Sequence, residues 1–310
     1  MEALLNWVKS HCPSKQRRLW ETVSVRRALP RFADDSGKGG GGDDAACDDL
    51  AMVSSVGISK GTRLPVPPAC ILSFDVVEKS PIGIVFAGVD KYTLFALFLM
   101  WQKRVRNSHW APYLDVLPRD VSMHPITFLR RKNAPRLLKA LESHPALLRA
   151  LGAQRAKLEQ EWESVLQLVR LHKLKSSSDE GIKDLLGAFA GPAAPSVEEF
   201  IWANAMVISR AFNMAEPRMM CMLPFVDSMN HNLDAPNVRW RPKLPRGFFV
   251  VTVIKDIAAG EELTARYHEP CERPEQIPMD ELRKFLMYGF SDRGTFDDVL
   301  EAAAAAGADI

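Results

Sequence analysis

The stretch LPFVDSMNHN, from Leu223 to Asn232, places three polar side chains directly after an apolar run. Asp227, Asn230 and His231 follow one another closely where the pattern predicts that a strand ends. Functional side chains often lie at such positions, because loops positioned by a rigid scaffold carry binding and catalytic groups. An Asx-type turn formed by Asp227 or Asn230, with His231 bonded nearby, explains the same residues without a function. On the residue pattern alone, this structural interpretation is favoured.

Three further segments carry candidate site residues. Arg210 ends an apolar helix in ISRAF, Tyr267 ends a predicted strand in EELTARY, and Tyr288 and Phe290 flank a glycine in MYGF. An arginine in the last turn of a helix often bonds the carbonyl groups there, but its planar guanidinium also matches a carboxylate. Buried tyrosines and paired aromatic rings are more often structural than functional. Each segment by itself therefore leaves its role open.

Apolar periodicity divides the chain into a β-rich part, a helical part and a second β-rich part. From Leu50 onward, Gly61 and nearby prolines break the first β-rich part into short strands. Ser196, followed three residues later by Glu199, predicts a capping box at the start of a helix. The predicted helices cover residues 2–11, 90–106, 134–175, 196–210 and 282–288, with a Ser-, Gly- and Pro-rich connector at 176–195. This order indicates one sheet system split by a helical insert.

The composition is that of an ordinary globular protein. The chain has 310 residues, 47% hydrophobic and 25% charged, and Lys+Arg 40 against Asp+Glu 38 leaves a net charge of +2. Such a balance gives no reason to expect nucleic acid or an anionic membrane as a partner. No apolar run approaches the about 20 residues that span a bilayer, and the N-terminus does not resemble a signal peptide. The Gly- and Asp-rich segment 34–49 is predicted to be flexible.

Metal and common hydrolase chemistry are not indicated. His268 and Cys271 have the spacing H-x-x-C. Cys221 and His231 precede them, but structural zinc sites usually show two paired spacings, so no metal site is predicted. The five scattered cysteines include no C-x-x-C pair and favour a reducing compartment. The metalloprotease motif H-E-x-x-H is missing.

Taken in order, seven segments resemble those of the SET-domain protein methyltransferases, in the branch that contains the Rubisco large-subunit lysine methyltransferase. They are ISKGTRLPVP, LFALFLMWQKRVRNSHWAPYLDVLP, LEQEWESVLQLV, VEEFIWANAMVISRAF, LPFVDSMNHN, IAAGEELTARY and MYGF, all between residues 50 and 290. Each segment alone is weak evidence, but their order is specific. The resemblance implies an α+β fold, in which a SET-domain β-fold of short strands is split by a helical insertion.

The resemblance also implies S-adenosylmethionine as the methyl donor. By their positions in the motifs, Asn230 and His231 would hold the methionine amine and the adenine edge. Arg210 would face the methionine carboxylate. Asp227 would buttress the loop, and Phe290 would pack near the adenine. These five residues form the expected cofactor-binding set.

On the acceptor side, the resemblance implies a lysine of a non-histone protein. Tyr267 would be the active-site tyrosine, and Tyr288 would line the channel for the substrate lysine. Methyl transfer from a sulfonium is an in-line displacement, so positioning matters more than a strong nucleophile of the enzyme. The lysine must be neutral to attack, and an aromatic channel disfavours its charged form by desolvation. We therefore expect Tyr267 to orient the amine or the methyl group rather than to act as a base.

Two departures from the family pattern keep other functions open. The family has a glycine-rich motif where residues 49–51 of this chain read DLA. The family's C-terminal substrate-binding domain is expected to be absent. A catalytically weak or inactive SET module that binds a protein is the resulting alternative. Protein-histidine methylation is another, although the AF pair at residues 211–212 resembles the lysine-directed members.

The expected organisation has five parts. They are an N-terminal helix with a Gly/Asp-rich flexible segment (1–49), the SET N-terminal part (50–118), the helical insertion (119–199), the SET C-terminal part with the cofactor and active-site motifs (200–290), and an Ala-rich tail (291–310). We expect a monomer that acts on a protein substrate, with no nucleic-acid or membrane partner. The expected location is the cytoplasm or the nucleus, with the plastid left open.

Overall fold

Two units, each discontinuous in sequence, make up the fold of the computed structural model. The structure describes residues 2–27, 50–119, 124, 145–174, 177–212, 220–243, 248–268, 276–288, 299 and 302. The first unit holds Met1–Leu72, Asp115–Asp120 and Leu223–Glu269. The second unit holds Ser73–Leu114, Val121–Met222 and Pro270–Ile310.

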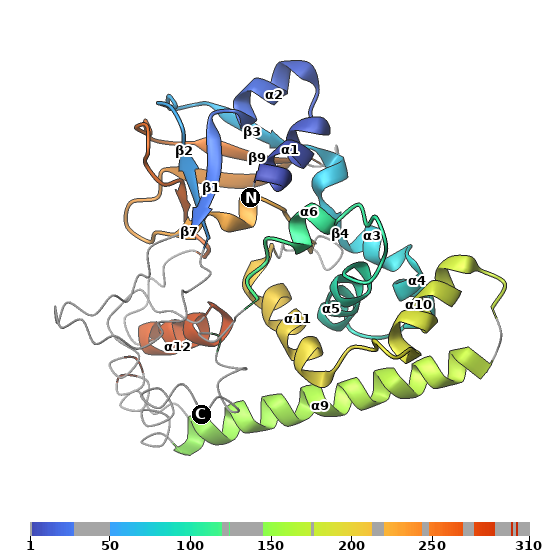
Figure 1. Cartoon of the computed structure of the whole chain (residues 1–310). Coiled ribbons are helices and arrows are strands. Elements are labelled where there is room, and N and C mark those ends of the chain that lie inside the picture. The colour runs from blue at the N-terminus through green and yellow to red at the C-terminus, as the bar shows by residue number, and fades with distance from the viewer. Residues whose placement is uncertain are drawn as a thin grey trace, which may run out of the picture. The chain divides into compact units, whose positions relative to one another are not determined.

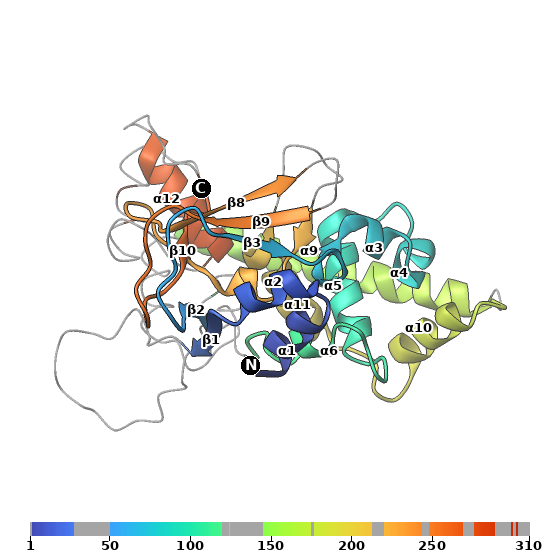
Figure 2. The ribbon, with the colours of Figure 1, turned by 90° about the horizontal axis from the view of Figure 1, so that it is seen from above.

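A five-stranded sheet forms the centre of the first unit. In spatial order its strands are β3 (Arg63–Val66), β9 (Phe248–Val253), β8 (Val238–Lys243), β10 (Thr264–Ala265) and β7 (Asn230–His231). The strands β3, β9 and β8 lie side by side (Figure 2) and pair antiparallel. The strand β10 pairs parallel with both β8 and β7. Because β3 precedes the helical block and the other four strands follow it, the prediction of one sheet system split by an insert is confirmed.

A two-stranded sheet joins the N-terminal segment to the same unit. It consists of β1 (Val23–Arg27) and β2 (Leu50–Ser54), which run antiparallel. The sequence analysis did not anticipate β1, although its two valines alternate with polar residues and are buried. The backbone N–H of Leu263 donates to the carbonyl of Met52 at 2.8 Å, so β2 also lies beside the segment that leads into β10. The turn before that segment contains Gly260, whose φ of 82° favours glycine.

The N-terminal helices α1 (Glu2–Ser10) and α2 (Ser14–Trp20) also belong to the first unit. The helix predicted for residues 2–11 is confirmed by α1, whose Leu4 and Val8 are buried. In α2, Trp20 is fully buried, and its indole Nε1 donates to the carbonyl of Pro65 at 3.1 Å. This bond ties α2 to β3. The Gly- and Asp-rich segment 34–49 lies outside the described residues.

Helices dominate the second unit. They are α3 (Phe74–Glu78), α4 (Pro81–Val85), α5 (Lys91–Gln102), α6 (Ala111–Leu114), α9 (Pro145–Leu174), α10 (Glu180–Ala190), α11 (Val197–Arg210) and α12 (Ile277–Tyr288). The helix α5 packs against α11, and the long helix α9 runs along both α10 and α11 (Figure 1). A stacked pair of rings, Trp162 and Phe200 with centroids 5.3 Å apart, joins α9 to α11. Short strands β4 (Leu72–Ser73), β6 (Cys221–Met222) and β5 (Ala211–Phe212) form a three-stranded sheet.

Local signals predicted several of these helices. Asp90 Oδ1 accepts the backbone N–H groups of Tyr92 and Thr93, at 2.9 and 3.2 Å, and so caps α5. The predicted helix at 196–210 is confirmed as α11. Ser196 Oγ caps this helix by accepting the N–H of Glu199 at 3.2 Å. Of the helical block predicted for 134–175, residues 134–144 lie outside the described residues and the remainder forms α9.

The connector predicted at 176–195 is wrong in its middle, where the chain forms α10. Leu185, Leu186 and Phe189 are spaced at one and three residues and are all buried. Asp179 Oδ1 caps the helix by accepting the N–H of Ile182 at 3.1 Å. Burial of this apolar face outweighs the loss of helix stability that two glycines cause. The prediction gave the composition of the segment too much weight and its apolar spacing too little.

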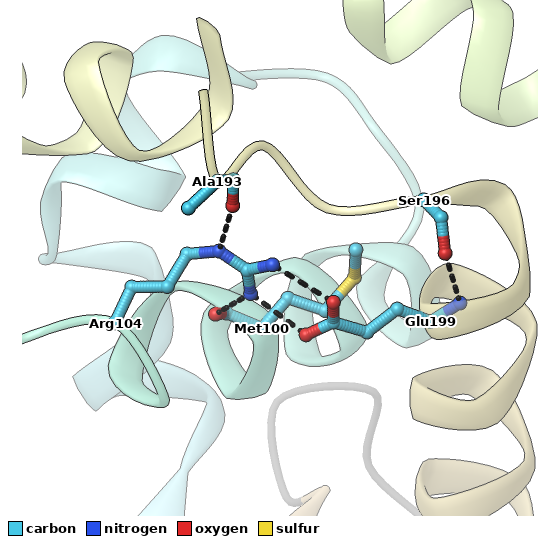
Figure 3. A network of polar contacts seen from close by, with 5 residues as sticks. All are labelled: Met100, Arg104, Ala193, Ser196 and Glu199. Atoms are coloured by element: carbon cyan, nitrogen blue, oxygen red, sulfur yellow. Dashed lines mark hydrogen bonds and ion pairs between the residues drawn. The ribbon is translucent and has the colours of Figure 1, made fainter. Parts of the chain in front are cut away.

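A charged network anchors the start of α11 to α5 (Figure 3). The guanidinium of Arg104 donates to both carboxylate oxygens of Glu199, at 2.7 and 2.8 Å. It also donates to the carbonyl oxygens of Ala193 at 3.1 Å and Met100 at 3.0 Å. The same Glu199 supplies the N–H that Ser196 caps, so one residue both begins the helix and holds it to its neighbour.

The unit boundaries differ from the sequence-based ranges, since the helical unit already begins at Ser73 rather than at residue 119. Those ranges stay a prediction of where the parts of the family fold begin and end. Within the described ranges, every helix is either too short or too polar to cross a lipid bilayer.

Candidate functional site

The loop that carries the candidate residues turns sharply at Phe225. This residue has φ 78° and ψ −44°, a conformation that bulky side chains rarely adopt and that stores about 1–3 kcal/mol of strain. The ring of Phe225 is fully buried and meets the ring of Trp20 edge-on, with centroids 5.5 Å apart. The burial of both rings therefore holds a strained turn that directs the chain into the 3₁₀ turn η3 (Val226–Ser228) and then into β7.

Asn230 lies in β7 with its amide held by two protein groups. Its Nδ2 donates to the carbonyl of Leu50 at 3.1 Å and to Oε1 of Glu262 at 2.5 Å. The strand β7 pairs parallel with β10, and in this pairing Thr264 lies opposite Asn230. The side chain is half-buried. Asn230 thus joins three segments that are far apart in the sequence.

His231 and Tyr267 form the second part of the site. The backbone N–H of Tyr267 donates to His231 Nδ1 at 2.9 Å, and the two rings lie 5.1 Å apart. An Nδ1 that accepts a hydrogen bond carries no proton, so the ring proton of His231 lies on Nε2. The hydroxyl of Tyr267 donates to the carbonyl of Met229 at 2.5 Å. With its proton directed at Met229, the Tyr267 oxygen offers acceptor capacity to any further partner.

Asp227 lies within η3, four residues after the start of the loop. Its backbone N–H donates to the carbonyl of Leu223 at 3.0 Å, and its side chain is half-buried. The turn η3 contacts β2, which also receives the amide of Asn230. Of the predicted residues, the structure therefore places Asp227, Asn230, His231 and Tyr267 in the first unit, with His231 and Tyr267 in direct contact.

The remaining predicted residues belong to the second unit or lie outside the described residues. Arg210 is the last residue of α11, and Tyr288 is the last residue of α12. Burial raises the pKa of the Tyr288 hydroxyl, and the neighbouring Tyr92 raises it further, so Tyr288 stays neutral at physiological pH. Phe290 lies outside the described residues.

Two residues of interest were missed by the sequence analysis. Glu262 is the partner of Asn230, and Tyr92 lies close enough to Tyr288 to affect its ionisation. Glu262 lies within EELTARY, the motif that carries Tyr267, and this was the available signal. Tyr92 follows the N-cap of α5 and has no comparable sequence signal.

Metal binding and cysteine chemistry find no support among the described residues. The rings of His231 and His268 lie 4.7 Å apart, while Cys271 lies outside the described residues. In the part of the chain that is described, no group of three or more His, Cys, Asp or Glu side chains could hold a metal ion. Burial raises the pKa of the thiols of Cys70 and Cys221 to about 12, so neither is a nucleophile at neutral pH.

The family model of the SET domain matches residues 50–268 of this chain. Two curated plant proteins are similar in sequence to this chain. The chloroplastic ribulose-1,5 bisphosphate carboxylase/oxygenase large subunit N-methyltransferase of Nicotiana tabacum is 28% identical over 184 residues, 59% of this chain and 33% of that protein. The chloroplastic [fructose-bisphosphate aldolase]-lysine N-methyltransferase of Arabidopsis thaliana is 25% identical over 224 residues, 72% of this chain and 41% of that protein.

Solved structures share the fold. The SET domain of LSMT bound to lysine and AdoHcy superposes with a TM-score of 0.65 at 18% identity, covering 94% of this chain and 57% of that chain. Rubisco LSMT bound to AdoMet gives a TM-score of 0.65 at 18% identity, covering 94% of this chain and 56% of that chain. The chain thus spans less than half the length of the two curated relatives and just over half of the two solved chains.

Proposed function

Because this chain belongs to the SET-domain family, we propose that it is an S-adenosylmethionine-dependent protein-lysine N-methyltransferase that acts on a non-histone protein. The names of both curated relatives describe N-methyltransferases of non-histone proteins, which supports this class of substrate. The observation that carries the proposal lies in the first unit, where His231 and Tyr267 meet through a hydrogen bond and a ring contact, and the adjacent Asn230 is hydrogen-bonded to Glu262.

The groups around Asn230 fit the amino end of S-adenosylmethionine. An ammonium group only donates hydrogen bonds, and it is matched by the amide oxygen of Asn230 with the carboxylate of Glu262 nearby. His231, whose proton lies on Nε2, would hold the adenine edge with the surrounding loop. The planar guanidinium of Arg210 would hold the carboxylate of the methionine part. When bound, the cofactor supplies a methyl group on a positively charged sulfur.

The acceptor lysine has to lose its proton before it can attack. With an ordinary pKa of about 10.4, that deprotonation costs about 5 kcal/mol at pH 7. A desolvating aromatic channel lowers this cost, and Tyr288, which stays neutral, would line it without adding negative charge. The proton of the Tyr267 hydroxyl points at Met229, so the hydroxyl oxygen would accept a hydrogen bond from the lysine amine. This bond would orient the lone pair of the amine nitrogen.

The replacement Tyr267→Phe tests the catalytic part of the proposal. We expect turnover to fall by about 100-fold or more, because the orienting oxygen is lost. The dissociation constant for S-adenosylmethionine should change less than about threefold. The measurement is transfer of a tritiated methyl group to proteins of an extract, with mass spectrometry of the labelled product and calorimetry of cofactor binding. Tyr113→Phe, at a buried tyrosine of α6, is the matched control. Equal labelling by wild type and Tyr267→Phe would contradict the assigned role.

Cofactor binding is tested separately with Arg210→Ala. We expect its dissociation constant for S-adenosylmethionine to rise about 10- to 100-fold, since a hydrogen-bonded charge pair is worth roughly 1.5–3 kcal/mol. No binding heat for the wild-type chain at high cofactor concentration would favour the protein-binding module. Methylated histidine in the product would instead identify the acceptor as histidine.

The oligomeric state, the partners and the cellular location of the protein are also proposals. The sequence left the plastid open beside the cytoplasm and the nucleus, and both curated relatives are named as chloroplastic. This supports a plastid location. We retain the expectation of a monomeric protein that meets its protein substrate without nucleic acid or membrane.

A further inference from the structure

We propose that Glu262 is a positioning residue, which fixes the amide of Asn230 so that its carbonyl oxygen faces the ammonium group of S-adenosylmethionine. The proposal rests on the proposed function, because it concerns how the same site binds its cofactor. It adds a residue to which the motif comparison assigned no role.

The hydrogen bonds identify which end of the amide is which. The two groups that contact the side-chain amide of Asn230 are the carbonyl of Leu50 and the carboxylate of Glu262. Both groups only accept hydrogen bonds, so the amide atom between them must be the nitrogen. Its two hydrogens are thereby used within the protein. What Asn230 offers to a ligand is its Oδ1, an acceptor suited to a donor such as an ammonium group.

Glu262 is well placed to set this orientation because its own backbone is held on two sides. Its carbonyl accepts Nδ2 of Asn237 at 2.8 Å, and Asn237 is buried. Across the other side, Glu262 forms an antiparallel bridge with Val53 of β2. The carboxylate therefore approaches Asn230 from a rigid segment, whereas a single bond to Leu50 would leave the amide able to turn about its last torsion.

The charge of Glu262 acts in the same direction as its hydrogen bond. A carboxylate beside Asn230 attracts a cation and repels the carboxylate of an incorrectly placed methionine part. The adjacent Glu261 has a different role, because its carboxylate accepts the N–H of Ala258 at 2.7 Å and Nδ2 of Asn237 at 3.2 Å. Glu261 thus stabilises the turn, and it provides a matched control of the same chemistry one residue away.

Two ligands separate positioning from general destabilisation. S-Adenosylhomocysteine carries the amino acid end, and methylthioadenosine keeps the adenosine and the sulfur but lacks the ammonium and the carboxylate. For Glu262→Ala we expect the dissociation constant of S-adenosylhomocysteine, measured by calorimetry, to rise about tenfold. The constant for methylthioadenosine should change less than about twofold. Glu262→Gln, which keeps an acceptor oxygen and loses the charge, should lie between Glu262→Ala and the wild type.

A double variant tests whether Glu262 acts through Asn230. In the background of Asn230→Ala, we expect Glu262→Ala to cause no further loss of S-adenosylhomocysteine binding, because effects that share one interaction are not additive. The control Glu261→Gln should bind both ligands as the wild type does. Melting curves of each variant show whether it is folded at the temperature of the titration.

Three outcomes would overturn the inference. They are equal losses for both ligands in Glu262→Ala, unchanged binding of S-adenosylhomocysteine in that variant, and additive losses in the double variant. A wild-type chain that binds neither ligand would instead remove the proposed function. The failure of this inference and the failure of the proposed function are therefore distinguishable by the wild-type titration alone.

Discussion

At the scale of single residues, the site depends on a strained backbone that the core holds in place. Phe225 has a positive φ, and its fully buried ring contacts the fully buried Trp20. Trp20 is itself bonded to Pro65 of β3. A residue of the N-terminal helix α2 thus supports the loop that carries Asp227 and Asn230. Strain of this kind persists only where the surrounding packing determines it, which is common at functional sites.

The strain at Phe225 can be measured by comparing two replacements. Phe225→Ala and Phe225→Gly should both destabilise the fold by about 3–5 kcal/mol, because each leaves a cavity. We expect Phe225→Gly to be the more stable of the two by about 1 kcal/mol, which reverses the usual order of alanine and glycine, because only glycine adopts this φ without strain. Urea unfolding followed by tryptophan fluorescence measures the difference.

A glycine elsewhere in the first unit provides the control. Gly61 has φ 89°, and a Cβ added there would have no atom within 4 Å. Gly61→Ala should therefore lower the free energy of unfolding by about 1 kcal/mol, and only because alanine is strained at this φ. If Phe225→Ala is as stable as Phe225→Gly while Gly61→Ala shows its expected cost, the turn at Phe225 is not strained.

At the scale of elements, the helix that ends in Arg210 is held at its other end. Glu199 lies in the first turn of α11, and its carboxylate accepts two hydrogen bonds from Arg104, which follows α5. The two side chains are 22% and 20% exposed, so the pair is partly shielded from water and salt. A bidentate pair with two further carbonyl acceptors restrains α11 in direction as well as in position.

Removing this anchor should destabilise the second unit measurably. We expect Arg104→Ala to lower the free energy of unfolding by about 2 kcal/mol, and Arg104→Lys to recover only part of this loss, because an ammonium cannot form the forked pair. Unfolding in urea is the measurement. The control is Lys103→Ala, where loss of the contact with the ring of Trp202, 4.1 Å away, should cost no more than about 1 kcal/mol. Equal stabilities of Arg104→Lys and the wild type would show that charge alone suffices.

At the scale of the whole molecule, a buried histidine makes stability depend on pH. His124 is 6% exposed, and its Nε2 donates to the carbonyl of Met287 in α12 at 3.1 Å. Burial lowers the pKa of His124 to about 4, although the hydrogen bond to Met287 opposes this shift. The folded chain therefore keeps His124 neutral under conditions in which the unfolded chain takes up a proton.

The sign of the pH dependence follows from that difference. The stability contributed by neutral His124 is fully present above its unfolded pKa of about 6.5 and is lost as the pH falls from there through about 4. The full loss is on the order of 3 kcal/mol. His124→Gln keeps a donor without titrating, so its free energy of unfolding should fall less between pH 6.5 and 4.5. Parallel curves for the two proteins in urea titrations at these pH values would refute the assignment.

The family and its overall plan could be predicted from the sequence, because their signals are local or ordered along the chain. The resemblance to the SET-domain methyltransferases is confirmed by the match over residues 50–268. The capping box that begins at Ser196 marked α11, and apolar residues at helical spacing marked α5. The helix α10 was missed because glycines and serines dominated the composition around it, although its apolar face was visible at helical spacing.

Local signals also identified Asn230, His231 and Tyr267, but only the tertiary structure decided what these residues contact. Neighbouring residues of an extended chain point to opposite sides, so the choice between Glu261 and Glu262 as the partner of Asn230 depends on how the segment lies against β2 and β7. That register is set by hydrogen bonds between segments far apart in the sequence, as in the bond from Asn230 to Leu50, which are 180 residues apart. The order of motifs along the chain identifies the family and its candidate residues, while long-range pairing, which no short stretch contains, selects their partners.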